Sequence, residues 1–294
     1  MREWKECKMN KLLKDILGKG PFEDLDVVCD KYHMYISDRN PNPGSCNTVW
    51  KYNFKSGNCQ ELPSLPERCC QSQLVVTNNK LYLIGVDEAQ KSPRFHMIWI
   101  QIPGSLDQQC QISESTIVLQ RLASIYMVTI SGSNLEKSQL LVCGGRDPAK
   151  DVFNAKHYST VPRFDIETQQ WDYARGMWQE KNYLKITVHK NKIYALGGNM
   201  YEAQVVDYRN FNDDTVLQHF EVYDPDTNDW DVLTPPDYFF DALVSTFYGI
   251  YALRQHASNG VYFYDVEEDE WSMHHRNLTH YRTAVSAPIY PYNS

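Results

Sequence analysis

The chain has 294 residues, a net charge of −8, and 20 Tyr, 11 Phe and 7 Trp residues. Lys and Arg form no long run, which argues against nucleic acid and anionic membrane as partners, because both bind through clustered basic residues. No apolar stretch is long enough to span a bilayer or to act as a secretory signal. The eight cysteines form no CxxC pair, so we expect reduced thiols in the cytoplasm, with the nucleus or the cytoskeleton as alternative locations.

Short apolar runs that end in turn residues recur along the chain roughly every 55 residues. Each run predicts a buried strand, because it is brief, continuous and followed by a change of direction. In chain order the four runs are Leu81–Gly85, Leu140–Gly145, Ile193–Gly198 and Ile250–Leu253, the last followed by Arg254 and Gln255 where the two preceding runs have glycines.

A second element follows the last three of these runs. It has two aromatic residues seven positions apart, and the residues between them are polar and rich in Asp, Thr and Asn, as is typical of a turn. This spacing predicts a β-hairpin with one aromatic residue on each strand. The pairs are Phe164 with Trp171, Tyr223 with Trp230 and Tyr264 with Trp271; Tyr52 with Cys59 is a weaker copy.

Together the two elements resemble the Kelch repeat. The best copy runs from Gly197 and Gly198 to Trp230, and the copy from Gly144 and Gly145 to Trp171 is nearly as good. The resemblance implies an all-β propeller of four-stranded blades around a central axis. In that fold the glycines end an inner strand where a positive φ is needed, and the aromatic pairs fill the space between blades. We therefore expect structural roles for these residues.

The repeat spacing predicts a single propeller domain over residues 1–294. Six blades are predicted, with five as the alternative. The sixth blade would combine the terminal segments, 1–20 and 281–294, and would remove exposed sheet edges; a helix over Met9–Gly18 is a competing or additional interpretation of the first segment. The five blades within the chain are predicted at 24–66, 70–118, 122–179, 182–236 and 239–279, and the long spacers 146–160 and 199–217 are predicted to be binding loops.

No catalytic motif is found, and the chain lacks GxSxG, HExxH and a phosphate-binding loop with Lys. The densest histidine group, His274, His275 and His280, is expected to be solvated at a blade edge. We therefore expect no enzyme activity, no cofactor and no metal. A propeller enzyme such as an oxidase is the alternative from a different functional class.

The resemblance implies a protein-binding module, specifically the substrate-recognition part of a BTB–Kelch adaptor for a cullin-3 ubiquitin ligase. No BTB or BACK segment is found in residues 1–294, so cullin-3 is expected as a partner only if the full-length protein has a BTB domain. A Kelch scaffold on the actin cytoskeleton is the alternative. The resemblance predicts that a protein or peptide binds to one loop face, at Arg68, Arg121, Arg146, Tyr183, Asn199, Tyr238, Phe239, Arg254, Tyr281 and Arg282.

Overall fold

The structure is a computed structural model. It describes residues 25–38, 48–62, 70–77, 80–86, 95–101, 112–117, 126–131, 138–144, 159–181, 184–197, 219–238, 240, 242–254 and 260–276. Within these residues, twenty strands form five four-stranded antiparallel sheets. Each sheet is a meander, because every strand pairs with the next strand along the chain.

The strands are short and similar in length in all five sheets. The first sheet has β1 (Leu25–Cys29), β2 (His33–Asp38), β3 (Val49–Asn53) and β4 (Cys59–Glu61). The second has β5 (Cys70–Thr77), β6 (Lys80–Val86), β7 (Phe95–Gln101) and β8 (Ile112–Ile117). The third has β9 (Tyr126–Ser131), β10 (Ser138–Cys143), β11 (Val161–Asp165) and β12 (Gln170–Ala174). The fourth has β13 (Lys185–His189), β14 (Lys192–Gly197), β15 (His219–Asp224) and β16 (Asp229–Leu233), and the fifth has β17 (Ala242–Ser245), β18 (Ile250–Arg254), β19 (Gly260–Asp265) and β20 (Glu270–Arg276).

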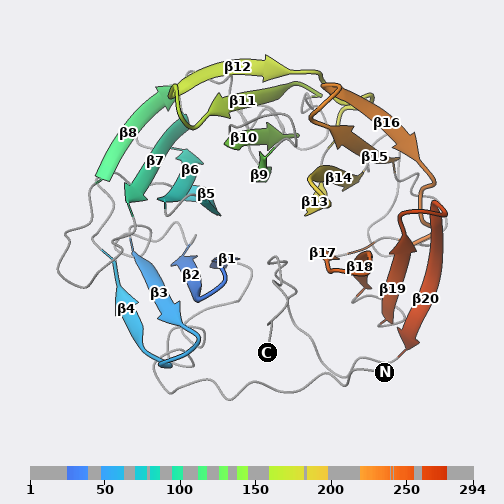
Figure 1. Ribbon diagram of the computed structural model, residues 1–294, viewed down its shortest axis with the longest axis horizontal. Coiled ribbons are helices and arrows are strands. Elements are labelled where there is room, and N and C mark those ends of the chain that lie inside the picture. The colour runs from blue at the N-terminus through green and yellow to red at the C-terminus, as the bar shows by residue number, and fades with distance from the viewer. Residues whose placement is uncertain are drawn as a thin grey trace, which may run out of the picture.

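The five sheets are arranged around a central axis (Figure 1). The first strand of each sheet lies nearest the axis and the fourth lies at the periphery. Neighbouring first strands are in contact: β1 with β5, β5 with β9, β9 with β13 and β13 with β17. The described part of the chain is therefore an all-β propeller of small antiparallel sheets.

The second strand of a sheet explains the continuous apolar runs of the sequence. Leu140, Leu141, Val142 and Cys143 of β10 are all fully buried, and Ile193–Gly197 of β14 is buried throughout. Successive side chains of a strand point to opposite faces, so these strands are covered by a neighbouring sheet on each side. Because both faces are covered, apolar and polar side chains do not alternate along these strands.

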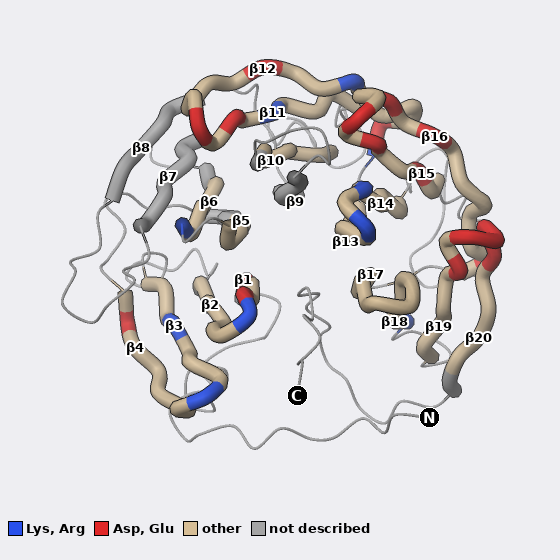
Figure 2. Tube along the Cα trace, in the orientation of Figure 1, with Lys and Arg blue, Asp and Glu red and all other residues tan. Residues whose placement is uncertain are grey.

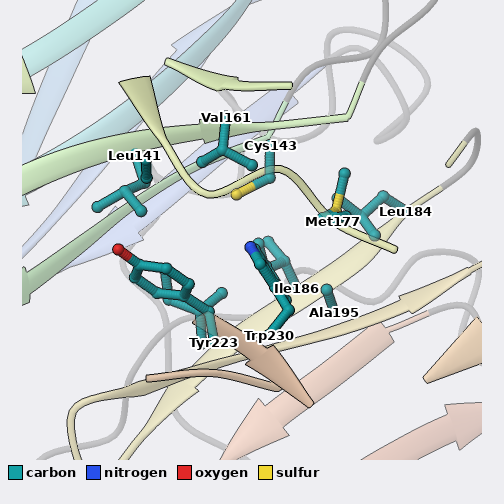
Figure 3. Packing of buried hydrophobic residues seen from close by; sticks show 11 residues of the cluster. Leu141, Cys143, Val161, Met177, Leu184, Ile186, Ala195, Tyr223 and Trp230 are labelled. Carbon is teal, nitrogen blue, oxygen red and sulfur yellow. The ribbon is translucent and has the colours of Figure 1, made fainter. Parts of the chain in front are cut away.

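Apolar clusters between adjacent sheets form the core. One cluster lies between the third and fourth sheets, where Leu141 and Cys143 meet Tyr223 and Trp230 (Figure 3). A second cluster joins the fourth and fifth sheets, and a third joins the first and second. The sheets are therefore held together face to face by side chains rather than by a shared backbone ladder.

A repeated hydrogen-bond clamp also links the third sheet to the fourth, and the fourth to the fifth, at the periphery. In the fourth sheet, the hydroxyl of Tyr223 donates to Asn228 Oδ1 (2.9 Å), and the same oxygen accepts from the backbone N–H of Arg175 (3.1 Å), which follows β12. The indole Nε1 of Trp230 donates to the carbonyl of Arg175 (2.8 Å). The turn of the fourth sheet thus holds the end of the third sheet.

The fifth sheet has the same clamp, with one residue of a different type. Tyr264 donates to Asp269 Oδ1 (2.6 Å), and Asp269 accepts from the backbone N–H and the hydroxyl of Thr234 at the end of the fourth sheet. Trp271 Nε1 donates to the carbonyl of Thr234 (2.9 Å). Asp269 therefore takes the place of Asn228, and both residues have a positive φ of 54°.

The predicted hairpins are present with the expected pairing. Phe164 lies opposite Trp171, Tyr223 opposite Trp230 and Tyr264 opposite Trp271, with ring centroids 4.9–5.2 Å apart. In the weaker copy, Tyr52 lies opposite Cys59. The sequence spacing of seven residues therefore corresponds to two strands joined by a tight turn.

Each of the five sheets lies inside one of the intervals predicted for a blade. The terminal segments 1–20 and 281–294, on which the sixth blade and the competing helix depend, lie outside the described residues, as do 199–217 and most of 146–160. The sixth blade and the binding loops therefore stay predictions. Among the described residues, no helix has the length and apolar character needed to cross a membrane.

Candidate functional site

The meander topology gives every sheet two different ends. The turns that join the first strand to the second, and the third to the fourth, lie at one end, which we call the turn end. The connections between the second and third strands, and from one sheet to the next, lie at the other, which we call the connection end. The sequence predicted that a partner binds at the connection end.

Most residues of the predicted binding face are beyond what the structure describes. Tyr238 and Arg254 are the two described members of that set. The members outside the described residues are Arg68, Arg121, Arg146, Tyr183, Asn199, Phe239, Tyr281 and Arg282, together with the motif residues Gly145 and Gly198.

Tyr238 and Arg254 contact each other, but the Arg254 side chain is not exposed to a partner. The guanidinium carbon of Arg254 lies 4.5 Å from the centroid of the Tyr238 ring, and Arg254 is only 5% exposed. Tyr238 also packs against Tyr262, with ring centroids 5.3 Å apart. The sequence predicted that Arg254 contacts a partner; in the structure its side chain is covered by the protein itself and supports Tyr238 through a cation–π contact.

Trp178 is exposed at the connection end and was not selected from the sequence. It lies in the connection from β12 to β13, and 60% of its surface is accessible. Its backbone N–H donates to Glu221 Oε2 (2.9 Å), and its indole Nε1 donates to the carbonyl of Trp230 (2.6 Å). Trp178 is therefore a large apolar side chain that is held in place while its surface stays open to solvent.

The connection that carries Trp178 is anchored by a buried ion pair. Lys181 Nζ lies 2.8 Å from Glu221 Oε1, and the two side chains are 0% and 1% exposed. Glu221 also accepts the backbone N–H of Gln179 (3.2 Å). Burial lowers the pKa of Lys181, although the charge of Glu221 acts in the opposite direction. A lysine with a lowered pKa is a candidate catalytic group, but this one is enclosed and cannot meet a substrate, so we assign it a structural role.

Gly144 allows the same connection to pack closely on the third sheet. Its φ is +71°, as predicted for the motif glycines, whereas the equivalent Gly197 ends β14 without a positive φ, so the prediction holds for Gly144 and is wrong for Gly197. A Cβ atom at this position would lie 3.2 Å from Leu184 Cδ2 and 3.3 Å from the carbonyl oxygen of Lys181. Both the backbone conformation and the available space therefore favour glycine.

Other exposed residues lie on the strands and the connection next to Trp178. The side chain of Arg175 is 62% exposed and that of Val232 is 66% exposed. Val232 is paired across the sheet with Glu221, the residue that holds the Trp178 backbone. Tyr173, near the end of β12, is 64% exposed. Trp, Tyr and Arg are the residue types that dominate the energy of protein interfaces.

Residues 182–236 match the Kelch motif. The matched segment covers the whole fourth sheet, including the Tyr223–Trp230 hairpin and the glycine at the end of β14. No curated protein matches the chain. The chain therefore contains a Kelch motif within a propeller arrangement, and Kelch propellers are generally protein-binding modules.

The Kelch arrangement explains which residues of the site are structural. The Tyr–Trp pairs and the glycine at 144 are used to pack the sheets, whereas Trp178 is left at the surface of a connection. Over the residues that the structure describes, no group of three or more His, Cys, Asp or Glu side chains is placed to hold a metal ion. His274, a member of the histidine group noted in the sequence, is exposed and lies edge-on to Tyr251.

Proposed function

We propose that this Kelch propeller binds a partner protein at its connection end, with Trp178 as the main anchor. The observation that carries the proposal is that Trp178 is 60% exposed and yet is held by hydrogen bonds from both its backbone and its ring. A side chain that is ordered before binding loses little conformational entropy on association. Arg175 would add a charged contact beside it.

We further propose that the partner is a substrate delivered to a cullin-3 ubiquitin ligase, as in adaptors of the BTB–Kelch type. The Kelch motif at 182–236 supports this, and the role requires a BTB domain in the full-length protein. The proposed role is one of binding without catalysis. We place it in the cytoplasm, with the nucleus and the cytoskeleton as further locations.

The experiment is an affinity capture from cell lysate with quantitative mass spectrometry. The wild-type protein is compared with Trp178→Ala and Arg175→Ala. Tyr32→Ala is the matched control, because Tyr32 is 59% exposed but lies at the turn end of the first sheet. We expect Trp178→Ala to reduce recovery of the specific partners about tenfold or more, and Tyr32→Ala to leave it unchanged. If Trp178→Ala recovers the same partners while its thermal unfolding midpoint is unaltered, the proposed face is wrong.

The adaptor role needs a separate readout. The ubiquitination of each captured partner is measured in cells with and without cullin-3. We expect partners lost in Trp178→Ala to lose ubiquitin chains when cullin-3 is depleted. Unchanged chains, together with co-sedimentation of the propeller with actin filaments, would favour the cytoskeletal alternative over the adaptor.

A further inference from the structure

The turn end of the fifth sheet has an unusual aromatic tip. The turn between β17 and β18 places Phe247 and Tyr248 at its apex, and they are 77% and 69% exposed. Such turns are normally made of Gly, Asn, Asp and other polar residues. The corresponding turn of the fourth sheet follows this rule, with Lys190 and Asn191. Folding of the turn alone does not explain two exposed aromatic rings.

The aromatic tip is held in one conformation. Thr246 donates its backbone N–H and its hydroxyl to the carbonyl of Gly249, at 2.9 Å and 3.0 Å, and its Oγ1 accepts from the N–H of Tyr248. A Cβ atom on Gly249 would lie 2.7 Å from the Phe263 ring, so the turn packs tightly on its own sheet. The two exposed rings meet edge to face at 5.4 Å. The backbone of the tip is therefore held by hydrogen bonds and by packing on its own sheet.

The outer turns at the same end are strongly acidic. The turns that join the third and fourth strands of the third, fourth and fifth sheets span residues 165–170, 224–229 and 265–270, and they contain no Lys or Arg. Figure 2 shows Asp and Glu gathered at these three turns. Some of these carboxylates stabilise their own turns, but Glu268 and Glu270 of the fifth sheet are exposed.

The first turn of the fourth sheet connects the aromatic tip to the acidic turn of the fifth sheet. The ring of His189 lies 3.1 Å from the hydroxyl of Ser245, which begins the aromatic turn. The adjacent Lys190 forms an ion pair with Glu267 at 2.9 Å. The tip and the acidic turn therefore belong to one continuous surface, which we call the aromatic–acidic surface: Phe247, Tyr248, Lys190, Glu267, Glu268 and Glu270.

We propose that the aromatic–acidic surface binds a second partner protein through a basic segment that combines Arg or Lys with aliphatic residues. The aliphatic side chains and the planar face of a guanidinium would pack against the exposed rings. The surrounding carboxylates would supply opposite charge, which increases the association rate and selects against acidic partners. This surface is built from turns of the fourth and fifth sheets and shares no residue with the Trp178 site, which lies on the connection between the third and fourth sheets.

The proposal is tested with two fluorescein-labelled decapeptides, one of alternating Arg and Leu and one of alternating Glu and Leu, by fluorescence anisotropy with the full chain. We expect the Arg peptide to bind at least tenfold more tightly than the Glu peptide, and its affinity to fall as salt is raised. Phe247→Ser and the pair Glu268→Lys, Glu270→Lys should each weaken the Arg peptide about tenfold.

Matched variants separate the proposed surface from general charge effects. Lys190→Met should tighten the Arg peptide several-fold, because it releases Glu267 from its ion pair. Three controls should leave the affinity unchanged: Tyr32→Ser at the equivalent turn of the first sheet, Glu61→Lys in β4, and Trp178→Ala at the connection end. Equal binding of the two peptides, no binding of either, or an unchanged affinity in Phe247→Ser would overturn the proposal.

Discussion

Two buried side-chain pairs occupy equivalent places at successive sheet junctions, with different chemistry. Lys181 lies ten residues after Trp171, and Phe240 lies ten residues after Trp230. Their partners, Glu221 and Tyr262, are both the third residue of the third strand of the sheet that follows. The first junction uses an ion pair at 2.8 Å, whereas the second uses two aromatic rings with centroids 5.0 Å apart. Equivalent positions at the two junctions are thus filled by a polar pair in one case and by an aromatic pair in the other, and the register of β19 and β20 shifts between Val261 and Tyr262.

We predict that Lys181→Met lowers the free energy of unfolding by about 3–5 kcal/mol, because it leaves a buried carboxylate without its counter-charge. The double variant Lys181→Phe, Glu221→Tyr copies the neighbouring junction and should be less destabilised than Lys181→Met. Urea unfolding followed by tryptophan fluorescence measures both. A double variant that is as unstable as the single one would show that the two junctions are not interchangeable.

At the scale of elements, the outer hairpin turns of the fourth and fifth sheets hold the end of the preceding sheet. Asn228 and Asp269 both have a positive φ, a conformation that Asn and Asp adopt more readily than most residues. Gln169 has the same conformation in the third sheet. Burial alone would raise the pKa of Asp269, but hydrogen bonds from Tyr264 and Thr234 outweigh it, so that the pKa is lowered from its usual value of 3.8. The turn of the fifth sheet is therefore stabilised by an ionised carboxylate.

This lowered pKa gives the clamp a pH dependence. A carboxylate with a lowered pKa in the folded state contributes stability that is present above its unfolded pKa and is lost as pH falls through the folded value. We predict that Asp269→Asn, which copies Asn228, loses less stability than the wild type when the pH is lowered from 5 to 3. Asp231→Asn, an exposed position on β16, is the control and should behave like the wild type. Equal acid sensitivity in all three proteins would show that Asp269 does not stabilise the folded state through its charge.

At the scale of the whole molecule, stability depends on the interfaces between neighbouring sheets. Each apolar cluster joins two adjacent sheets, so a defect acts first on one junction. Trp230 is 1% exposed and is part of the cluster between the third and fourth sheets. Trp271 occupies the equivalent place in the fifth sheet but is only partly buried.

We predict that Trp230→Ala lowers the free energy of unfolding by about 3–5 kcal/mol, as expected for removal of a buried tryptophan. Trp271→Ala should cost at least 1 kcal/mol less, because it removes less buried surface. Chemical denaturation gives both values, and limited proteolysis should cleave Trp230→Ala first near the third and fourth sheets. A larger loss in Trp271→Ala would contradict this ranking.

The functional surfaces were less predictable than the fold, for a physical reason. Arg254 was selected because it follows an apolar strand, yet it is buried against Tyr238 from another segment of the chain. Trp178 and Phe247 lie outside the repeated motif residues, and the sequence analysis did not select them. Whether a side chain is covered depends on the neighbouring sheet, and no local pattern contains that information.

The repeat, the hairpins and their aromatic pairs were determined by the sequence alone, because strand length, turn chemistry and the spacing between Tyr223 and Trp230 are local properties. The resemblance to the Kelch repeat followed from the same local sequence pattern. Only the tertiary structure decided which residues of those repeats pack between sheets and which are exposed, as for Lys181 and Trp178 in a single connection. Burial is a property of two surfaces in contact, and residues distant in the sequence supply the second surface.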